Sequence, residues 1–246
     1  MKSIIVIPAR LNSTRLPGKV LLDLKGSTVV HHVYKQCIKA NNIDAVYIAT
    51  DSLKVKQSCE KFTQNIIMTA KEHISGTDRI SEALQDIHCD IVVNVQGDEP
   101  FISPKLIQQL VNALKSKSVM ASAMSEIDNI RDLKNPNIVK VITDHRDEAL
   151  YFSRSIIPYP RNAQEQLLKN SLPKSPLFYK HIGIYAYKKD FLLKLSKMHP
   201  SPLEKIESLE QLRVIENGHK IKMIQTDYHS IGIDTQEDYE VALGLM

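Results

Sequence analysis

Cysteine is scarce in this chain, whose 246 residues include only Cys37, Cys59 and Cys89. An odd number of cysteines without a CxxC pair argues against a disulfide framework and a zinc site, and favours a reducing compartment. Long hydrophobic runs are missing as well. The first apolar stretch ends at Pro8 and Arg10, too early for a signal peptide, and no segment approaches the roughly 18 apolar residues of a membrane span. We therefore expect a cytoplasmic protein that does not insert into membranes.

Two glycine-rich phosphate-binding motifs are also missing. None of the eight glycines lies in a GxGxxG pattern. Gly18-Lys19 cannot complete a P-loop, because Ser13 stands where the first glycine of that motif belongs. These absences argue against an ordinary P-loop ATPase and against a glycine-rich dinucleotide dehydrogenase.

Clustered positive charge is a third feature that the sequence lacks. Its 32 basic and 28 acidic residues give a net charge of +4, and they are interspersed along the chain. A nucleic-acid-binding protein would carry a basic stripe or an aromatic-basic motif, so we expect no nucleic-acid partner. The small positive excess fits an anionic small substrate. An RNA-binding module is the alternative from another class, and a salt titration of RNA binding would test it.

Strand-like and helix-like segments alternate in the first half of the chain. Short apolar runs predict strands at 3–7, 45–50, 66–68 and 91–95, and apolar residues at helical spacing predict helices at 29–38, 52–62, 78–87 and 103–114. This order is typical of a mostly parallel sheet with right-handed crossovers, flanked by helices. The sequence therefore predicts an α/β fold.

The pattern changes after residue 118. Four strand-like runs, VMASAM, IVKVIT, ALYFSR and FYKHIGIYAY, predict a smaller mixed or antiparallel part over 119–200. Within it, residues 155–178 contain four prolines and little periodicity, so we expect a mobile loop that closes over a ligand. Capping signals at Ser201 and Thr235 predict two C-terminal helices, the first ending at Gly218. We expect 1–118, 119–200 and 201–246 to be parts of one integrated domain.

Residues 91–100, IVVNVQGDEP, lead an apolar strand directly into two acids, Asp98 and Glu99. A run this apolar is typical of a parallel strand that is buried on both faces, and ligands of such sheets lie beyond the carboxyl ends of the strands. The two acids would stand at that edge. The alternative is a solvated β-turn, since aspartate favours turns and Pro100 ends the strand.

Three cations follow the first strand within ten residues: Arg10, Arg15 and Lys19. Guanidinium and ammonium groups suit a polyphosphate, and backbone N–H groups of the same loop can add to its binding site. The alternative is a solvated basic loop. The position after the first strand of a parallel sheet favours the ligand-binding interpretation.

Eight motifs occur in series along the chain: IPAR…SxRLPGK, SGTDR (75–79), NVQGDEP (94–100), NPNxVK (135–140), ALYFSR (149–154), HIGIYAY (181–187), EKxESLEQLR (204–213) and GIDTxED (232–238). Together they resemble the CMP-Kdo synthetases, the 3-deoxy-manno-octulosonate (Kdo) cytidylyltransferases. The resemblance implies a Rossmann-like nucleotidyltransferase fold, with the smaller part devoted to sugar binding and dimerisation, a homodimer and dependence on Mg²⁺. It also implies that the anomeric hydroxyl of the sugar attacks the α-phosphate of CTP and expels pyrophosphate, for lipopolysaccharide biosynthesis.

The resemblance also implies roles for individual residues. The nucleotide-binding residues would be Pro8, Ala9, Arg10, Arg15, Lys19, Ser75, Gly76, Thr77, Arg79 and Gln96, and the sugar-binding residues would be Gln96, Arg154, His181, Tyr185, Glu210 and Gln211. Asp98 and Asp234 would bind Mg²⁺ through hard oxygen ligands, and with Arg10 and Lys19 they would form the catalytic set. Glu99 would be structural. Because two neighbouring acids repel, replacing one of the metal-binding pair with an amide is expected to preserve folding and to raise thermal stability.

Several of these residues have a structural alternative. SGTDR could cap a helix through Ser75 or Thr77. His181 and Tyr185 lie four apart, so on a strand they share a face and could belong to the core. Glu210 could form a surface pair with Arg213 on one helix.

Departures from the family pattern are few. Val20 stands where proline is usual and Leu11 where an aromatic residue is common, and Gln236 and Tyr239 vary the last motif. No charged or metal-binding position is lost, so the reaction is unaffected, and the sugar stays open between Kdo and an analogue such as 8-amino-8-deoxy-Kdo. The alternative is a CMP-sialate-type or other nucleotide-sugar synthase of the same fold. A metal-dependent glycosyltransferase would show D-x-D, which QGDEP does not contain.

Overall fold

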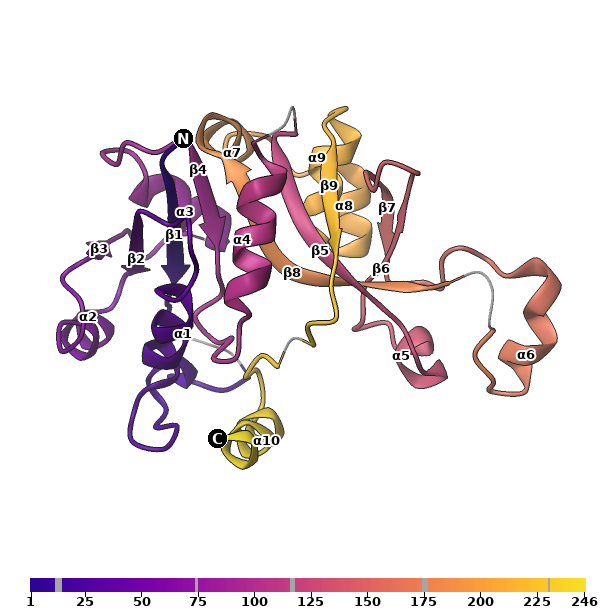
Figure 1. Ribbon diagram of the computed structural model, residues 1–246, viewed down its shortest axis with the longest axis horizontal. Coiled ribbons are helices and arrows are strands. Elements are labelled where there is room, and N and C mark those ends of the chain that lie inside the picture. Colours follow the sequence, from indigo (N-terminus) through magenta and orange to yellow (C-terminus); the bar gives the residue numbers. More distant parts are fainter. Residues whose placement is uncertain (12–14, 74, 116–117, 174–176, 230) are drawn as a thin grey trace.

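A nine-stranded sheet extends across the part of the chain that the structure describes (Figure 1). The computed structural model describes residues 1–11, 15–73, 75–115, 118–173, 177–229 and 231–246. The strands are β1 (Ser3–Pro8), β2 (Ala45–Thr50), β3 (Ile66–Met68), β4 (Ile91–Asn94), β5 (Met120–Glu126), β6 (Lys140–Thr143), β7 (Ala149–Ser153), β8 (Tyr179–Lys188) and β9 (Ile221–Gln225).

The sheet is parallel in its first half and mixed in its second. β3, β2, β1 and β4 lie in that order, and each pair is parallel. β8 pairs antiparallel with both β4 and β5, and β9 pairs parallel with β5 at the far edge. β6 pairs antiparallel with β7 and with β8. The predicted α/β class and the mixed second part are therefore confirmed.

Helices cover both faces of the sheet. They are α1 (Val29–Cys37), α2 (Leu53–Cys59), α3 (Gly76–Ala83), α4 (Pro104–Ala113), α5 (Ile130–Lys134), α6 (Gln164–Leu168), α7 (Lys189–Leu195), α8 (Pro202–Glu207), α9 (Gln211–Glu216) and α10 (Gln236–Leu245). Residues of α1, α2 and α4 share a core with Ile5 and Ile7, whereas residues of α3, α7 and α9 share one with Ile4 and Val6. Because alternate residues of a strand point to opposite faces, the two sets of helices lie on opposite sides. None of the described helices is long and apolar enough to cross a membrane.

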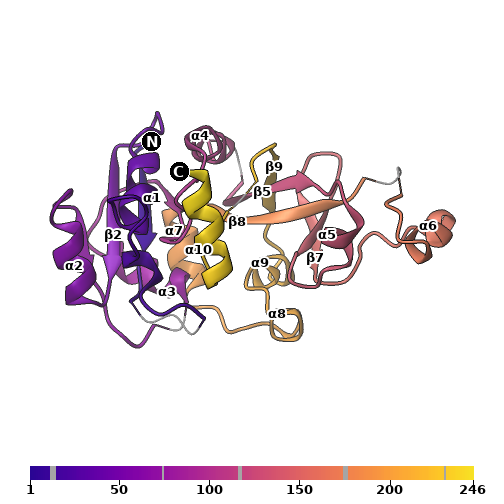
Figure 2. The same ribbon diagram turned by 90° about the horizontal axis from the view of Figure 1, so that it is seen from below.

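The C-terminal helix α10 returns to the N-terminal half of the chain, where it lies near α1 (Figures 1 and 2). Ala242 of α10 belongs to a small buried cluster with Leu24 and Val29. A capping box starts this helix, because the Thr235 hydroxyl accepts the N–H of Asp238 at 3.2 Å while the Asp238 carboxylate accepts the N–H of Thr235 at 2.8 Å. The residue before the cap, Asp234, is thereby brought to the loop that follows β1.

Two C-terminal elements differ from the sequence-based prediction. The sequence predicts one helix from Ser201 to Gly218, but the structure has α8 and α9, because Ser208 takes a left-handed conformation with φ 54°. Such a residue cannot continue a right-handed helix. Gly218, with φ 74°, follows the last residues of α9 as expected. β9 was not predicted, although Ile221 and Met223 alternate with Lys222 and are buried in its pairing with β5, which is a strand pattern that was not used.

Residues 155–178 contain secondary structure that their prolines do not indicate. The short helices η2 (Arg161–Ala163) and α6 lie within this segment. Leu167 and Leu172 pack against a small cluster that contains Phe178. These two short helices were not predicted, and the mobility of the segment and its closure over a ligand stay predictions. Residues 174–176 of the segment lie outside the described residues.

Candidate active site

The loops that follow β1 and β4 lie against each other at the carboxyl ends of these parallel neighbours. Gly97 permits this contact, since a Cβ atom at its position would lie 2.8 Å from the carbonyl oxygen of Pro8. A cavity of about 360 Å³, which we call the basic cavity, opens at this contact. It is lined by Pro8, Arg10, Arg15, Lys19, Val20, Gly76, Gln96, Gly97, Asp98 and Asp234.

Lys19 lies between the two acids that are expected to bind a metal. Its ammonium group donates to the carboxylates of Asp98 and Asp234, with Nζ 2.6 Å from Oδ1 of Asp234. Arg15 donates to the other oxygen of Asp234 at 2.9 Å. Burial alone would lower the pKa of Lys19, but the two carboxylates raise it above its usual value. The structure thus brings two acids from distant parts of the chain to one cation.

Two further contacts join the C-terminal segment to the loop after β4. The N–H of Ile233 donates to the carbonyl oxygen of Asp98 at 2.9 Å. Glu99 accepts a hydrogen bond from the hydroxyl of Tyr228 at 3.1 Å, and its Oε1 lies 3.6 Å from where a Cβ atom of Gly232 would stand. Glu99 does not line the basic cavity within the described residues, which agrees with its expected structural role.

The segment SGTDR starts α3 and borders the same cavity. The Ser75 hydroxyl accepts the N–H of Asp78 at 3.0 Å, and the Asp78 carboxylate accepts the N–H of Ser75 at 3.3 Å. The alternative interpretation of a helix cap is therefore confirmed for Ser75. It does not conflict with ligand binding, because Gly76, the next residue, lines the basic cavity.

Arg79 is a correction to the predicted nucleotide site. Its side chain is fully buried and does not line the basic cavity. The guanidinium donates to Asp51 at 2.8 Å, to the carbonyl oxygen of Ala70 at 3.2 Å and to the hydroxyl of Thr69. These contacts join α3 to the ends of β2 and β3, so Arg79 supports the fold beneath the site.

Replacing Arg79 with methionine is expected to destabilise the protein more than it affects catalysis. Removing one partner of a buried ion pair costs about 3–5 kcal/mol, and the lower end applies because Asp51 is 18% exposed. Urea denaturation measures the loss in the free energy of unfolding. Unchanged stability would contradict the structural role and return Arg79 to the predicted nucleotide site.

A second cavity of about 580 Å³ adjoins the basic cavity. We call it the β8 cavity, and it is lined by Gly76, Thr77, Asn94, Gln96, Asn137, Ile138, Val139, Lys180, His181, Ile182, Gly183, Tyr185, Ser208, Leu209, Glu210, Gln211 and His229. Gly76 and Gln96 line both cavities, so two ligands, one in each cavity, would meet at these residues. This position agrees with the assignment of Gln96 to both substrates.

His181 faces the β8 cavity as a neutral imidazole. Its Nε2 lies 2.9 Å from the hydroxyl of Ser122, which itself lies 2.9 Å from the carbonyl oxygen of Ile184. A hydroxyl has one proton, so when Ser122 donates to that carbonyl it accepts from Nε2–H, and Nδ1 is left as an acceptor. Burial lowers the pKa of His181 to about 3. His181 is therefore suited to a sugar hydroxyl rather than to a carboxylate.

This low pKa predicts how stability depends on pH. The usual pKa of histidine is 6.5, so the unfolded chain takes up the proton first as the pH falls. The stability that neutral His181 contributes is complete above about pH 6.5 and is lost as the pH falls toward about 3. Urea denaturation at several pH values should therefore show a shallower decline for His181→Gln than for the wild type. Parallel curves for the two proteins would contradict the assignment.

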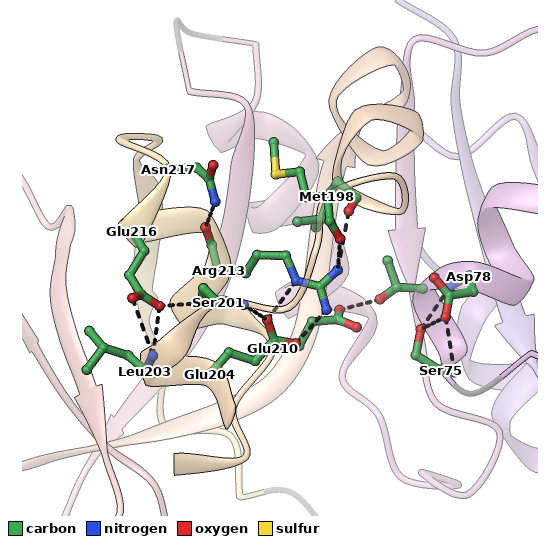
Figure 3. Close-up of polar contacts among 12 residues, drawn as sticks. Ser75, Asp78, Met198, Ser201, Leu203, Glu204, Glu210, Arg213, Glu216 and Asn217 are labelled. Carbon is green, nitrogen blue, oxygen red and sulfur yellow. Dashed lines mark hydrogen bonds and ion pairs between the residues drawn. The ribbon is translucent and has the colours of Figure 1, made fainter. Parts of the chain in front are cut away.

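Glu210 lines the β8 cavity and connects it to α3 through a hydrogen bond. Figure 3 shows Glu210 between Arg213 and the start of α3, where Ser75 and Asp78 lie. The hydroxyl of Thr77 donates to the Glu210 carboxylate at 2.5 Å, and burial raises the pKa of Glu210 although this hydrogen bond opposes the rise. The structural alternative for Glu210, a surface pair with Arg213, is wrong. Arg213 is buried and binds Glu204 instead, with Nε 2.7 Å from Oε2, and it also donates to the carbonyl oxygen of Met198 at 2.9 Å.

Of the remaining residues that are predicted to bind the sugar, two line the β8 cavity and one does not. Tyr185 and Gln211 line the β8 cavity, and the tyrosine hydroxyl donates to the glutamine at 3.5 Å. Arg154 does not line this cavity, because its guanidinium is turned to main-chain carbonyls, among them that of Glu207 at 2.7 Å. The prediction that Arg154 contacts the sugar is thus corrected.

Some residues of the β8 cavity were not predicted. Asn137 lies in the NPNxVK motif and Lys180 precedes His181, so both positions carried a signal that was not used. Lys180 donates to Asp132 at 3.0 Å. Ser208 and His229 reach the cavity through loop geometry, which no local pattern indicates.

A mixed α/β sheet whose parallel strands end at a cationic cavity, beside a polar cavity, is the arrangement that a nucleotidyltransferase needs to hold a polyphosphate next to its acceptor. Residues 4–221 match the cytidylyltransferase family, and the chain belongs to this family. It is 43% identical to 3-deoxy-manno-octulosonate cytidylyltransferase from Geotalea uraniireducens, over 99% of this chain and 98% of the relative. It is 45% identical to the enzyme of the same name from Fusobacterium nucleatum, over 98% and 95% of the two chains.

A solved structure has the same fold. It is described as CMP:2-keto-3-deoxy-manno-octonic acid synthetase complexed with CTP, and it matches this chain with a TM-score of 0.92 at 38% identity. The match covers 100% of this chain and 98% of the other. The comparisons confirm the family, the nucleotidyltransferase fold and the enzyme class that the sequence predicts.

Proposed function

We propose that the protein transfers CMP from CTP to Kdo and releases pyrophosphate, for lipopolysaccharide biosynthesis. The observation that carries the proposal is the junction of the two cavities at Gly76 and Gln96. The basic cavity suits a triphosphate, and the polar β8 cavity suits a sugar acid with several hydroxyl groups. The names of the relatives and of the solved structure support CTP and Kdo as the pair.

The geometry indicates how the residues would share the reaction. Arg10, Arg15 and Lys19 would hold the triphosphate and compensate its charge, since phosphoryl-type transfer depends on positioning and electrostatics. The anomeric hydroxyl would lie near Gln96 and attack the α-phosphorus. A new oxygen–phosphorus bond forms, the bond from the α-phosphorus to the bridging oxygen of the β-phosphate breaks, pyrophosphate leaves with the electron pair of that bond, and the proton of the hydroxyl passes to solvent water.

The sugar would be oriented by its two ends. Kdo carries its carboxylate on the anomeric carbon, so this group would lie at the junction, within reach of the cations of the basic cavity. Neutral His181, Tyr185 and Gln211 would bind hydroxyl groups deeper in the β8 cavity. This arrangement requires no positive charge at the end of the sugar that lies deeper in the β8 cavity. It therefore suits Kdo, and it leaves the 8-amino-8-deoxy analogue and sialic acids to be tested.

Asp98 and Asp234 fit Mg²⁺, because both carboxylates already converge on a cation, the ammonium of Lys19. The described residues contain no group of three or more potential protein ligands, but one or two carboxylates completed by phosphate oxygens and water are a usual Mg²⁺ set. When bound, Mg²⁺ would neutralise phosphate charge and align the triphosphate. Lys19 would then exchange its two carboxylates for phosphate oxygens.

CTP is expected to be the preferred nucleotide, with UTP roughly tenfold to a hundredfold poorer. The pocket for the base should accept a hydrogen bond from the cytosine amine, and a uracil carbonyl would leave that acceptor unpaired at a cost of about 1–3 kcal/mol. The measurement is kcat/KM for the two nucleotides with Kdo. Equal values would contradict recognition of the amine.

A homodimer in the cytoplasm completes the proposal. Large apolar side chains are exposed on β7, on α6 and near them, with Leu150 48%, Tyr159 63% and Leu168 76% exposed, so this part could meet a second copy. The described thiols are all free, as in a reducing compartment, and CTP is a cytoplasmic nucleotide. Light scattering would test the dimer.

The experiment that tests the proposed function is pyrophosphate release with each of four nucleoside triphosphates. Each is supplied alone, with Kdo, with 8-amino-8-deoxy-Kdo and with a sialic acid. Release that needs both CTP and Kdo supports the proposal. Release with ATP at the rate seen with CTP, or release that needs a sialic acid, would overturn it.

A further inference from the structure

Two cations that the mechanism does not use lie behind the wall of the β8 cavity. Lys140 is fully buried in β6, and Arg154 follows the last residue of β7. Lys140 pairs with Ser153 in the sheet, so the two cations start from neighbouring positions. Burial lowers the pKa of Lys140, and Arg154 lowers it further, whereas Glu207 opposes both effects.

Both cations donate to the backbone of one turn, residues 135–138. Nζ of Lys140 lies 3.0 Å from the carbonyl oxygen of Asn135 and 2.7 Å from that of Ile138. Nη1 of Arg154 lies 3.0 Å from the carbonyl oxygen of Pro136. Three of the four carbonyls of the turn are therefore held by positive charge, and the end of the same turn lines the β8 cavity.

Arg154 also holds a second turn of the cavity wall, the break between α8 and α9. Its Nε donates to the carbonyl oxygen of Glu207 at 2.7 Å, and its Nη2 to that of Ser208 at 3.4 Å. The carboxylate of Glu207 accepts the N–H of Arg154 at 2.9 Å and the hydroxyl of Ser153 at 2.6 Å. The residues after this turn, 208–211, line the cavity.

We propose that Lys140 and Arg154 are positioning residues that fix both turns of this wall and thereby set the affinity for the sugar acid. The inference rests on the proposed function. Neither side chain lines the cavity, so each acts through the backbone that it holds. Charge-assisted hydrogen bonds to several carbonyls leave these turns little freedom, and small displacements of a binding wall are costly. The basic cavity is built from other loops, so CTP binding should not depend on this pair.

Three variants test the inference. Lys140→Met and Arg154→Gln should each raise KM for Kdo by about 10- to 100-fold and leave KM for CTP unchanged. Lys189→Met is the matched control, because Lys189 also donates to a main-chain carbonyl, that of Ile87 at 2.6 Å, at the other end of β8. It should leave both KM values unchanged.

A conservative variant separates an effect on the affinity for the sugar from an effect on folding. It still tests the inference if Lys140→Met fails to fold. Arg154→Lys keeps the charge but lacks the planar fork, so it should melt close to the wild type while KM for Kdo stays raised. In the double variant Lys140→Met/Arg154→Gln, the loss of affinity for Kdo should be smaller than the two single losses added together as free energies, because both cations hold one turn. KM values that rise equally for CTP and Kdo, or a lower melting temperature with unchanged KM, would overturn the inference. A wild-type enzyme that is inactive on Kdo would overturn the proposed function and this inference with it.

Discussion

Asp98→Asn and Asp234→Asn should each lower turnover by about 10²–10³-fold, the size seen when one preorganised electrostatic contact is lost. Either change keeps the shape of the side chain and removes one negative charge from the pair that faces Lys19. Mg²⁺ should then bind more weakly and align the triphosphate less well. The measurement is turnover as a function of Mg²⁺ concentration, with Glu99→Gln as the matched control.

The structure reverses one expectation about these variants. The sequence predicts that relieving two repelling acids would raise thermal stability, but Lys19 lies between them and compensates both charges. An amide at either position removes an attraction to this lysine, so the melting temperature should fall. If Asp98→Asn turns over normally, or loses turnover only because it unfolds, Asp98 is a turn residue and does not bind the metal.

Lys19→Met should have an effect of similar size on turnover, about 10²–10³-fold, with a raised KM for CTP. The substitution removes a cation from the basic cavity and leaves two carboxylates facing each other. The variant should melt below the wild type without metal, and Mg²⁺ alone should raise its melting temperature more than that of the wild type, because no ammonium competes for the carboxylates. Melting curves with and without Mg²⁺, in the absence of nucleotide, test this.

Arg15→Met is the control for Lys19, since Arg15 contacts only Asp234 among the two acids and its side chain is 67% exposed. Its response to Mg²⁺ alone should stay close to that of the wild type. An identical Mg²⁺ response in Lys19→Met and the wild type would show that Lys19 does not occupy the metal position.

The parallel half of the fold could be predicted from the sequence because its signals are local. β4 is an apolar run whose one polar residue is Asn94, and Ser75 caps α3 within the motif SGTDR. The break at Ser208 could not be predicted, because a left-handed conformation at a residue other than glycine depends on tertiary contacts.

The difference between local sequence signals and tertiary contacts also explains which features of the site could be predicted. The basic cavity follows from the topology, since loops at the carboxyl ends of β1 and β4 must adjoin. The burial of Arg79 and the turn of Arg154 toward backbone carbonyls could not be predicted, because a motif shows that an arginine is present but not which partners its guanidinium meets. The partner of Lys19, Asp234, lies 215 residues away, and only the return of α10 brings it near.

The most direct test of the central claim follows the phosphates of CTP. The protein is incubated with Kdo, Mg²⁺ and CTP labelled either at the α- or at the γ-phosphate. The account predicts that the α label appears in a sugar product and the γ label in pyrophosphate, and that neither is released without Kdo. A γ label in the sugar product, or an α label released as free CMP at the same rate with and without Kdo, would contradict it.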